Sequence, residues 1–107
     1  MTANALLLAA ALTMTSGRQP SKCVADARTQ ALKLLLFHVD GDERAAIEPD
    51  SARQIGTVAS LTGRRRFDVI EVYGNVYKGH YRMRLIYAHL PGTCALMGQE
   101  IFELSDL

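Results

Sequence analysis

Apolar side chains recur at the spacing of one helix face in the segment from Ser21 to about Val39. This stripe consists of Cys23, Ala27, Ala31, Leu34, Leu35 and His38. Most of the charged residues in the segment fall outside the stripe. Pro20 and Ser21 favour a helix start, and Gly41 favours a helix end. The pattern predicts one amphipathic helix ahead of the remaining elements.

The rest of the chain is rich in Val, Ile, Tyr, Phe and Thr, which favour β-strands. The expected strands are Ala52–Leu61, Phe67–Tyr77, His80–Ala88 and Thr93–Leu104, with a further short edge strand at Arg44–Ile47. The turns between the main strands are too short for parallel crossovers, which need about a dozen residues. The sequence therefore predicts an α+β fold, in which one N-terminal helix packs on a four-stranded antiparallel meander sheet.

A trial register for the central hairpin separates apolar from polar side chains. It pairs Tyr77 with His80, Val72 with Leu85, and Ile70 with Tyr87. The inner face is then apolar and consists of Ile70, Val72, Val76, Tyr81, Met83, Leu85 and Tyr87. The outer face carries Glu71, Tyr73, Asn75, Tyr77, His80, Arg82 and Arg84. Because a slip of one residue would exchange the two faces, this segregation indicates which face the helix covers.

The same register extends through the turn at His89–Gly92 into the last strand. It pairs Ala88 with Thr93 and Tyr87 with Cys94, and it places Cys94, Leu96 and Phe102 on the inner face. Continued alternation also brings Glu100 to that face, where a carboxylate needs a buried donor. We expect either such a donor, for example a tyrosine hydroxyl, or a β-bulge near Gly98 to resolve the conflict.

The N-terminal segment has the order of a secretory leader. Ala5–Leu12 is an uncharged apolar block, and the small or polar residues Thr13–Gly17 follow it. The block is shorter than the roughly 20 residues of a membrane-spanning helix. We expect residues 1–20 to be a signal peptide and leader, residues 21–107 to be one domain, and the mature protein to be periplasmic or secreted. The alternative is a cytosolic protein in which the N-terminal segment is an integral helix.

The chain has two cysteines, Cys23 and Cys94, near opposite ends of the expected mature domain. Export would place them in an oxidising compartment, where disulfides persist. In the chain-entropy model, a bridge that closes so long a loop stabilises a small domain by roughly 4 kcal/mol. We expect a Cys23–Cys94 disulfide that joins the helix to the sheet. The alternative is a pair of buried thiols in a cytosolic protein.

Charge and motifs point away from several functions. The chain balances 12 Lys+Arg against 11 Asp+Glu, so a net charge of +1 gives no general attraction to nucleic acid or to an anionic membrane. His38, Asp40, Asp42 and Glu43 lie close in sequence, but they lack the spacing of a calcium loop and suit a solvated helix end. No serine lies in the glycine frame of a nucleophile elbow. We predict no catalytic, cofactor or metal site, and no binding to nucleic acid or, once the leader is removed, to a membrane.

Two stretches, Val76–Ala88 and Cys94–Ile101, resemble small exported bacterial proteins of unknown function, and the resemblance spans roughly Cys23–Glu103. One helix followed by an antiparallel meander also resembles the cystatin-like architecture. Cystatins inhibit cysteine proteases through a Gln-x-Val-x-Gly hairpin. The nearest segment here, Gln54–Val58, has glycine two residues after the glutamine and valine in the last position. The resemblance therefore implies a fold and no inhibitory activity.

Two features suit partner binding. Arginine favours carboxylate and phosphate groups, and the triplet Arg64, Arg65 and Arg66 falls in a turn, where it also suits a solubilising role. The outer face combines aromatic and cationic groups, which are enriched at interfaces: Tyr73, Tyr77, His80, Arg82 and Arg84. We expect a non-enzymatic binding module that meets a protein partner, or a second copy in a homodimer, through this face. The alternative is a small-ligand carrier with a pocket between helix and sheet around Tyr81, Tyr87 and Glu100.

Overall fold

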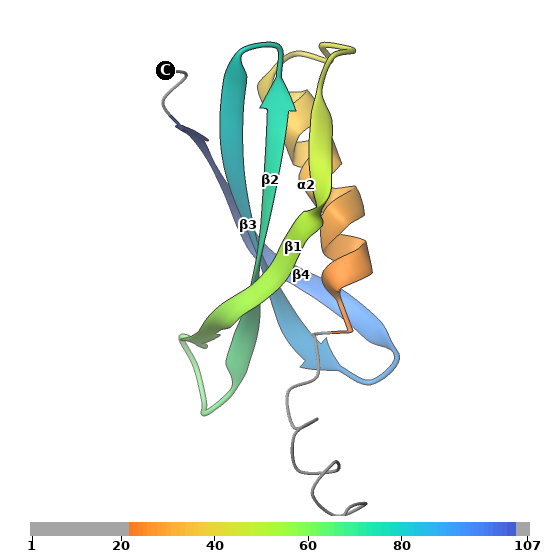
Figure 1. Cartoon of the computed structure of the whole chain (residues 1–107). Helices are drawn as coiled ribbons and strands as arrows, with labels where there is room; N and C mark the ends of the chain where they lie inside the picture. The colour runs from red at the N-terminus through yellow and green to blue at the C-terminus, as the bar shows by residue number, and fades with distance from the viewer. Residues whose placement is uncertain (1–21, 105–107) are drawn as a thin grey trace, which may run out of the picture.

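One helix lies against one face of a four-stranded antiparallel sheet, and the strands follow in chain order, β1-β2-β3-β4 (Figure 1). The structure is a computed structural model that describes residues 22–104. Its elements are α2 (Val24–His38), β1 (Ala46–Ala59), β2 (Arg66–Val76), β3 (Gly79–Leu90) and β4 (Thr93–Leu104). The predicted fold class is confirmed: the fold is α+β, with one helix on an antiparallel meander. The expected leader, residues 1–20, lies outside the described residues.

Helix α2 ends in a hydrogen-bonded left-handed turn. Asp40 adopts the left-handed conformation at φ 55°, and Gly41 follows at φ 75°. The Gly41 amide donates to the Leu36 carbonyl at 2.8 Å, which is the six-to-one bond of a Schellman motif. Asp is one of the few side chains that tolerate this conformation, so the helix stops just before the glycine that predicted its end.

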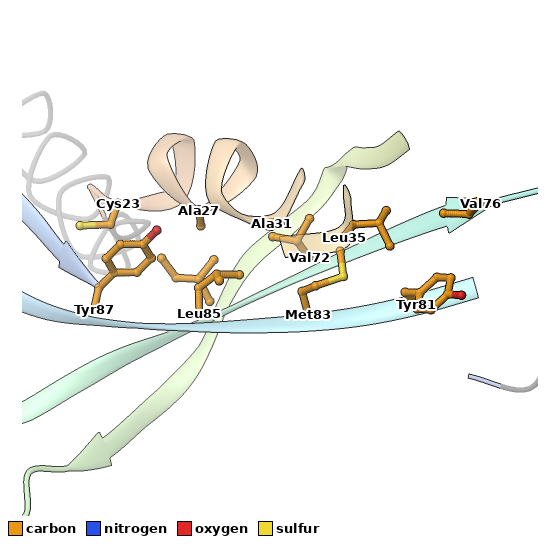
Figure 2. Close-up of a cluster of buried hydrophobic side chains, with 11 residues drawn as sticks. Cys23, Ala27, Ala31, Leu35, Val72, Val76, Tyr81, Met83, Leu85 and Tyr87 are labelled. Carbon is orange, nitrogen blue, oxygen red and sulfur yellow. The ribbon is translucent and has the colours of Figure 1, made fainter. Parts of the chain in front are cut away.

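Most of the helix stripe forms a single core with the inner face of β2 and β3 (Figure 2). Leu34 is only partly buried against this core, and the prediction that His38 belongs to the packed stripe is wrong, because its side chain is exposed at the helix end. The buried residues of the core are Cys23, Ala27, Ala31, Leu35, Ile70, Val72, Val76, Tyr81, Met83, Leu85 and Tyr87. The predicted apolar face is confirmed in full, because all its members belong to this set. Gly74 lets the layers approach closely: a Cβ there would lie 3.0 Å from Leu35 Cδ2 and 3.0 Å from the Ala46 carbonyl oxygen.

The central hairpin is shifted by two positions from the predicted register. Val76 pairs with Gly79, Val72 with Met83, and Ile70 with Leu85. The predicted pairs Tyr77–His80, Val72–Leu85 and Ile70–Tyr87 are therefore wrong. Tyr77 and Lys78 form the turn, with Tyr77 at φ 54°. Gly79 begins β3, where a Cβ would lie only 3.0 Å from a Tyr81 ring carbon. Because side chains alternate with a period of two, the shift leaves the face assignments within β2 and β3 unchanged. Tyr77, predicted on the outer face, lies in the turn instead.

The hairpin between β3 and β4 shows a similar shift. Leu90 pairs with Thr93, and His89 with Cys94, so the predicted pairs Ala88–Thr93 and Tyr87–Cys94 are wrong. Pro91 and Gly92 alone form the turn. Gly92 has φ 71°, and proline followed by a residue of positive φ is typical of a type II turn. The turn predicted at His89–Gly92 is therefore two residues longer than the turn in the structure.

The predicted bulge near Gly98 is confirmed. Tyr87 pairs with Leu96 but Ile86 pairs with Gly98, which leaves Met97 as the extra residue. Beyond the bulge the alternation of β4 reverses, so Ile101 packs against the core. Glu100 and Phe102 then face outward, opposite Arg84 and Arg82. The prediction that Phe102 lies on the inner face is wrong, because it continued the alternation across the bulge.

Strand β1 is one long edge strand. It unites the predicted strand Ala52–Leu61 with the short strand predicted at Arg44–Ile47. Pro49 has no amide hydrogen, and the ladder with β2 is interrupted after Glu48. The Ser51 hydroxyl bridges this gap: it donates to the Glu48 carbonyl at 2.6 Å and accepts from the Tyr73 amide at 2.8 Å. The strand therefore continues through the interval that separates the two predicted strands.

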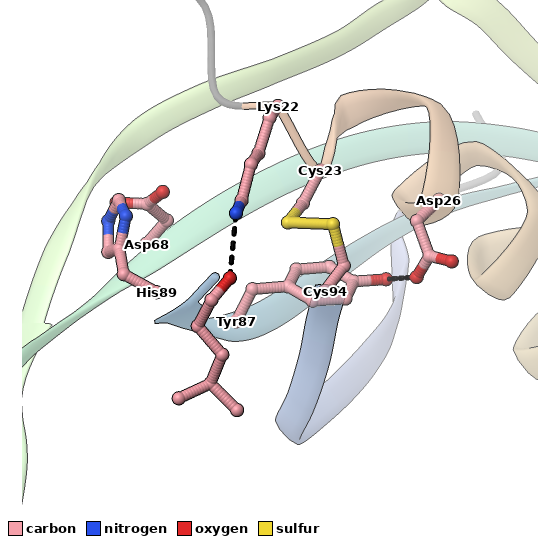
Figure 3. Close-up of a disulfide and its surroundings, with 8 residues drawn as sticks. Lys22, Cys23, Asp26, Asp68, Tyr87, His89 and Cys94 are labelled. Atoms are coloured by element: carbon pink, nitrogen blue, oxygen red, sulfur yellow. Dashed lines mark hydrogen bonds and ion pairs between the residues drawn. A yellow bond between two sulfur atoms is a disulfide. The ribbon is translucent and has the colours of Figure 1, made fainter. Parts of the chain in front are cut away.

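The predicted disulfide is confirmed. Cys23, directly before α2, is bonded to Cys94 near the start of β4, with a Cα–Cα distance of 5.6 Å and a sequence separation of 71 (Figure 3). Beside it, the Tyr87 hydroxyl donates to Asp26 Oδ2 at 2.6 Å. A covalent bond and a hydrogen bond thus hold the N-terminal end of the helix to the sheet.

Candidate partner-binding surface

The predicted partner-binding residues lie in three places on the molecule. Tyr73, His80, Arg82 and Arg84 lie together on the outer face, the side of β2 and β3 opposite to α2. Tyr77 lies in the β2–β3 turn. The arginine triplet lies at the far end of the sheet, where the β1–β2 loop runs into β2 (Figure 1). The structure brings the first group together and separates the other two from it.

Tyr73 and His80 belong to a hydrogen-bonded cluster centred on Glu48. The Tyr73 and His80 rings are stacked, with centroids 5.4 Å apart. Glu48 Oε2 accepts from Asn75 Nδ2 at 2.9 Å and lies 3.2 Å from His80 Nε2. These contacts tie β1, β2 and β3 together, so this part of the outer face has a fixed shape.

Arg84 is held between two carboxylates. Its Nε donates to Glu71 Oε2 at 3.1 Å, and its Nη1 lies 4.0 Å from Glu100 Oε1. Glu71 is only 4% exposed, so the arginine is the counter-ion of a buried carboxylate. The trial register did not reveal this pair, because the shift of two positions hid that Glu71 lies directly opposite Arg84. The positive charge of Arg84 is therefore neutralised by carboxylates of the same outer face.

Arg82 differs from Arg84, because it has no carboxylate partner among the described residues. Its guanidinium carbon lies 5.2 Å from the centroid of the Phe102 ring, a cation–π contact between β3 and β4. Its Nε is buried and has no hydrogen-bond acceptor. Phe102 itself is 48% exposed. Sequence reasoning missed Phe102, although the bulge signal at Gly98 would have placed it here.

Tyr77 is the exposed tip of the β2–β3 hairpin, at 69% exposure. The cations of Arg44 and Lys78 lie 4.8 Å and 5.5 Å from its ring centroid. Arg44 also forms an ion pair of 2.7 Å with Asp42. Hydrogen bonds from the Arg44 side chain and backbone lower the pKa of Asp42 to about 2. The tip is therefore a self-contained cluster of charges around an aromatic ring.

The three arginines of the triplet are not equivalent. Arg66 Nε donates to Thr57 Oγ1 at 2.7 Å, which fixes its side chain on the neighbouring strand β1. The side chains of Arg64 and Arg65 make no hydrogen bond or ion pair with another described residue. Both instead line a cavity of about 480 Å³. The remaining lining residues of this cavity are Ser60, Thr62, Gly63, Phe67, Ala88, Leu90 and Met97.

The three residues expected around an interior pocket do not surround one space. Tyr81 is 7% exposed and Tyr87 1% exposed, and both belong to the packed core. Burial, together with the hydrogen bond to Asp26, raises the pKa of Tyr87 well above its usual range. Glu100 faces the opposite side of the sheet, beside Arg84.

A histidine–carboxylate pair that sequence reasoning missed lies near the disulfide (Figure 3). His89 Nε2 is 2.8 Å from Asp68 Oδ1, which also accepts from Gln54 Nε2 at 2.9 Å. Such a pair orients an imidazole in hydrolases, where the base contacts a nucleophile. No serine, threonine or cysteine among the described residues hydrogen bonds to His89. Residues 22–104 also contain no group of three or more His, Cys, Asp and Glu side chains placed to hold a metal ion.

No family model, no curated protein and no solved structure matches the chain. The cystatin-like architecture is therefore a likeness of helix and sheet arrangement that no neighbour confirms. In the part of the chain that the structure describes, no helix has the length and apolar character to cross a membrane.

Proposed function

We propose that the protein is a small exported, non-enzymatic interaction module that binds a protein partner through the outer face of its sheet. Export, to the periplasm or the outside of the cell, is supported by the leader pattern of residues 1–20 and by the disulfide. The binding role is supported by one contact above all, the Arg82–Phe102 pair.

This pair is suited to a partner because Arg82 needs a hydrogen-bond acceptor and Phe102 exposes apolar surface, and an interface can supply the acceptor and cover the ring. Within residues 22–104, Arg82 has a buried Nε without an acceptor and no carboxylate partner, whereas Arg84 beside it is paired with Glu71. Phe102 leaves about half of its surface in water, at 48% exposure. A partner that covers the pair would bury the ring and bring a carboxylate or carbonyl oxygen to the guanidinium. Arginine and aromatic side chains in such settings dominate the binding energy of many interfaces.

The surrounding contacts hold this surface in one conformation before a partner binds. The Glu48 cluster and the Arg84–Glu71 ion pair fix the strands on either side, so little side-chain entropy remains to be lost on association. The face carries the carboxylates of Glu48, Glu71 and Glu100 as well as the cations of Arg82 and Arg84, which favours a specific partner over a general polyanion.

Photocrosslinking in the native host tests this proposal. A photoreactive benzoylphenylalanine in place of Phe102 should form one discrete adduct, and Arg82→Glu in the same chain should abolish it. The matched control carries the same group in place of Phe37, which is 84% exposed on the helix side of the molecule. An adduct of twice the monomer mass would identify a homodimer through this face. Equal adducts at both positions, or none at Phe102, would contradict the proposal.

Export is tested separately by mass spectrometry of the protein isolated from its native host. The mature chain should begin near residue 20 and contain no free thiol. An intact Met1 would instead support the cytosolic alternative, in which the N-terminal segment belongs to the fold.

A further inference from the structure

The cavity at the β1–β2 hairpin combines an apolar floor with a cationic rim. Phe67, Ala88, Leu90 and Met97 supply the floor, from strands β2, β3 and β4. The cavity is a surface hollow, open to solvent on one side, with a volume of about 480 Å³. The cavity lies at the opposite end of β2 and β3 from the β2–β3 turn.

The bulge in β4 helps to make this floor. Met97 is the extra residue, placed between Leu96 and Gly98 in the ladder, and it is 55% exposed. A bulge re-aims the side chain that it carries, and Met97 lines the cavity instead of packing in the core. Methionine is flexible and polarizable, so it adapts to apolar ligands of different shape.

The rim is held in shape by the loop itself. The Ser60 amide donates to the Arg65 carbonyl at 2.9 Å and closes the loop. Inside it, the Ser60 hydroxyl donates to the Thr62 carbonyl at 2.7 Å. Gly63 at φ 74° then reverses the chain. Arg64 and Arg65 follow this turn as exposed cations beside the apolar floor.

We propose that this cavity binds a free single-chain amphiphile with a carboxylate head, such as a medium-chain fatty acid. The planar guanidinium groups of Arg64 and Arg65 match a carboxylate geometrically and electrostatically. The floor accepts the alkyl chain, because burial of apolar surface away from water favours binding. A polar anion would contact only the cationic rim, and an uncharged hydrocarbon would contact only the apolar floor.

This ligand site is separate from the proposed partner-binding pair. Neither Arg82 nor Phe102 lines the cavity. A failure to bind amphiphiles would therefore leave the partner proposal unaffected, and the reverse also holds.

Nuclear magnetic resonance titration with monomeric decanoate tests the site. The Met97 methyl signal should shift saturably, whereas acetate, which lacks the chain, and decyltrimethylammonium, which reverses the charge, should cause no saturable shift. Arg64→Gln and Arg65→Gln should each weaken decanoate binding by about tenfold, as expected for loss of one charge-assisted contact.

Arg66→Gln is the matched control, because it removes the same charge from the same triplet but from a side chain held by Thr57. It should leave decanoate affinity within about twofold, since a screened charge outside the site contributes little. Equal weakening by Arg65→Gln and Arg66→Gln would overturn the proposal in favour of general electrostatic attraction. Binding to anionic phosphatidylglycerol vesicles without saturable decanoate binding would overturn it in favour of a membrane surface.

Discussion

At the level of single residues, Tyr87 connects the sheet to the first turn of the helix. Its ring is 1% exposed, and its hydroxyl donates to the carboxylate of Asp26. Asp26 itself is exposed and also benefits from the positive end of the helix dipole. Removing the hydroxyl with Tyr87→Phe should lower the free energy of unfolding by about 1–2 kcal/mol, measured by urea denaturation at pH 7. An unchanged midpoint would show that the bond contributes nothing.

The same tyrosine predicts a loss of stability in alkali. Burial, first, and the bond to Asp26 raise the pKa of Tyr87 above its ordinary value of 10.0. Below pH 10 the phenol is neutral in both states, so its contribution is complete. Above that pH the unfolded chain releases its proton while the folded chain retains it, and stability falls. Tyr87→Phe should reduce the fall between pH 9 and 11.

Asp42 and Arg44 allow a direct measurement of a surface contact. Hydrogen bonds from the Arg44 side chain and backbone lower the pKa of Asp42 to about 2, from an ordinary 3.8. Arg44→Gln should return the pKa of Asp42 towards the ordinary value, followed through its carboxyl carbon resonance in an acid titration. Because the folded-state pKa is the lower one, the stabilisation is present above about pH 4 and is lost as the pH falls towards 2. A value near 3.8 in the unaltered protein would refute the pairing.

At the level of elements, the close approach of α2, β1 and β2 depends on Gly74. An added Cβ would meet a β1 carbonyl oxygen and a helix side chain, both at 3.0 Å. The carbonyl cannot move without distorting the ladder, so Gly74→Ala should destabilise the protein by about 1–3 kcal/mol in urea denaturation. Gly56→Ala is the matched control, because nothing lies within 4 Å of its added Cβ. Equal effects of the two changes would mean that a difference in backbone entropy, and not the contact at Gly74, causes the loss of stability.

The sequence indicated the faces of the sheet better than its register. The inner and outer sets on β2 and β3 were predicted correctly, because a shift of two positions preserves the alternation. The turn residues were not, since Tyr77 takes a positive φ that tyrosine seldom adopts and Gly79 is placed in a strand. The predicted pairing of Tyr77 with His80 made Lys78 and Gly79 the turn. The Tyr81 ring lies against the place that a Cβ of Gly79 would occupy, so a residue without a side chain suits the start of β3.

The sequence predicted which residues make up the candidate site, but not which side chains contact one another there. The register error placed Arg84 opposite Tyr73, which concealed its ion pair with Glu71. The misfit of Glu100 pointed correctly to a bulge, yet the alternation was continued to Phe102. Following that bulge to its end would have placed Phe102 beside Arg82. The cavity at Arg64 and Arg65 has no sequence signature, because its floor is assembled from three strands.

At the level of the whole molecule, the disulfide links the two ends of the described domain. Cys23 is 2% exposed and packs in the core, and Cys94 lies near the start of the edge strand β4. The contacts of α2 with β4 are few compared with those to the other strands, so the bond supplies a connection that packing supplies only weakly. It also shortens the unfolded chain across a separation of 71 residues.

Removing the bridge should therefore destabilise the whole domain and not only one corner. The double change Cys23→Ala and Cys94→Ala should lower the free energy of unfolding by about 2–4 kcal/mol, the range typical of a disulfide in a small domain. Urea denaturation of the unaltered protein with and without dithiothreitol should show the same loss, whereas the double variant should be insensitive to the reductant. If the bond only fastened the helix N-terminus, native-state hydrogen exchange would quicken in the first turns of α2 and remain slow in β2 and β3. We expect faster exchange in all of these elements, because α2, β2 and β3 share one core.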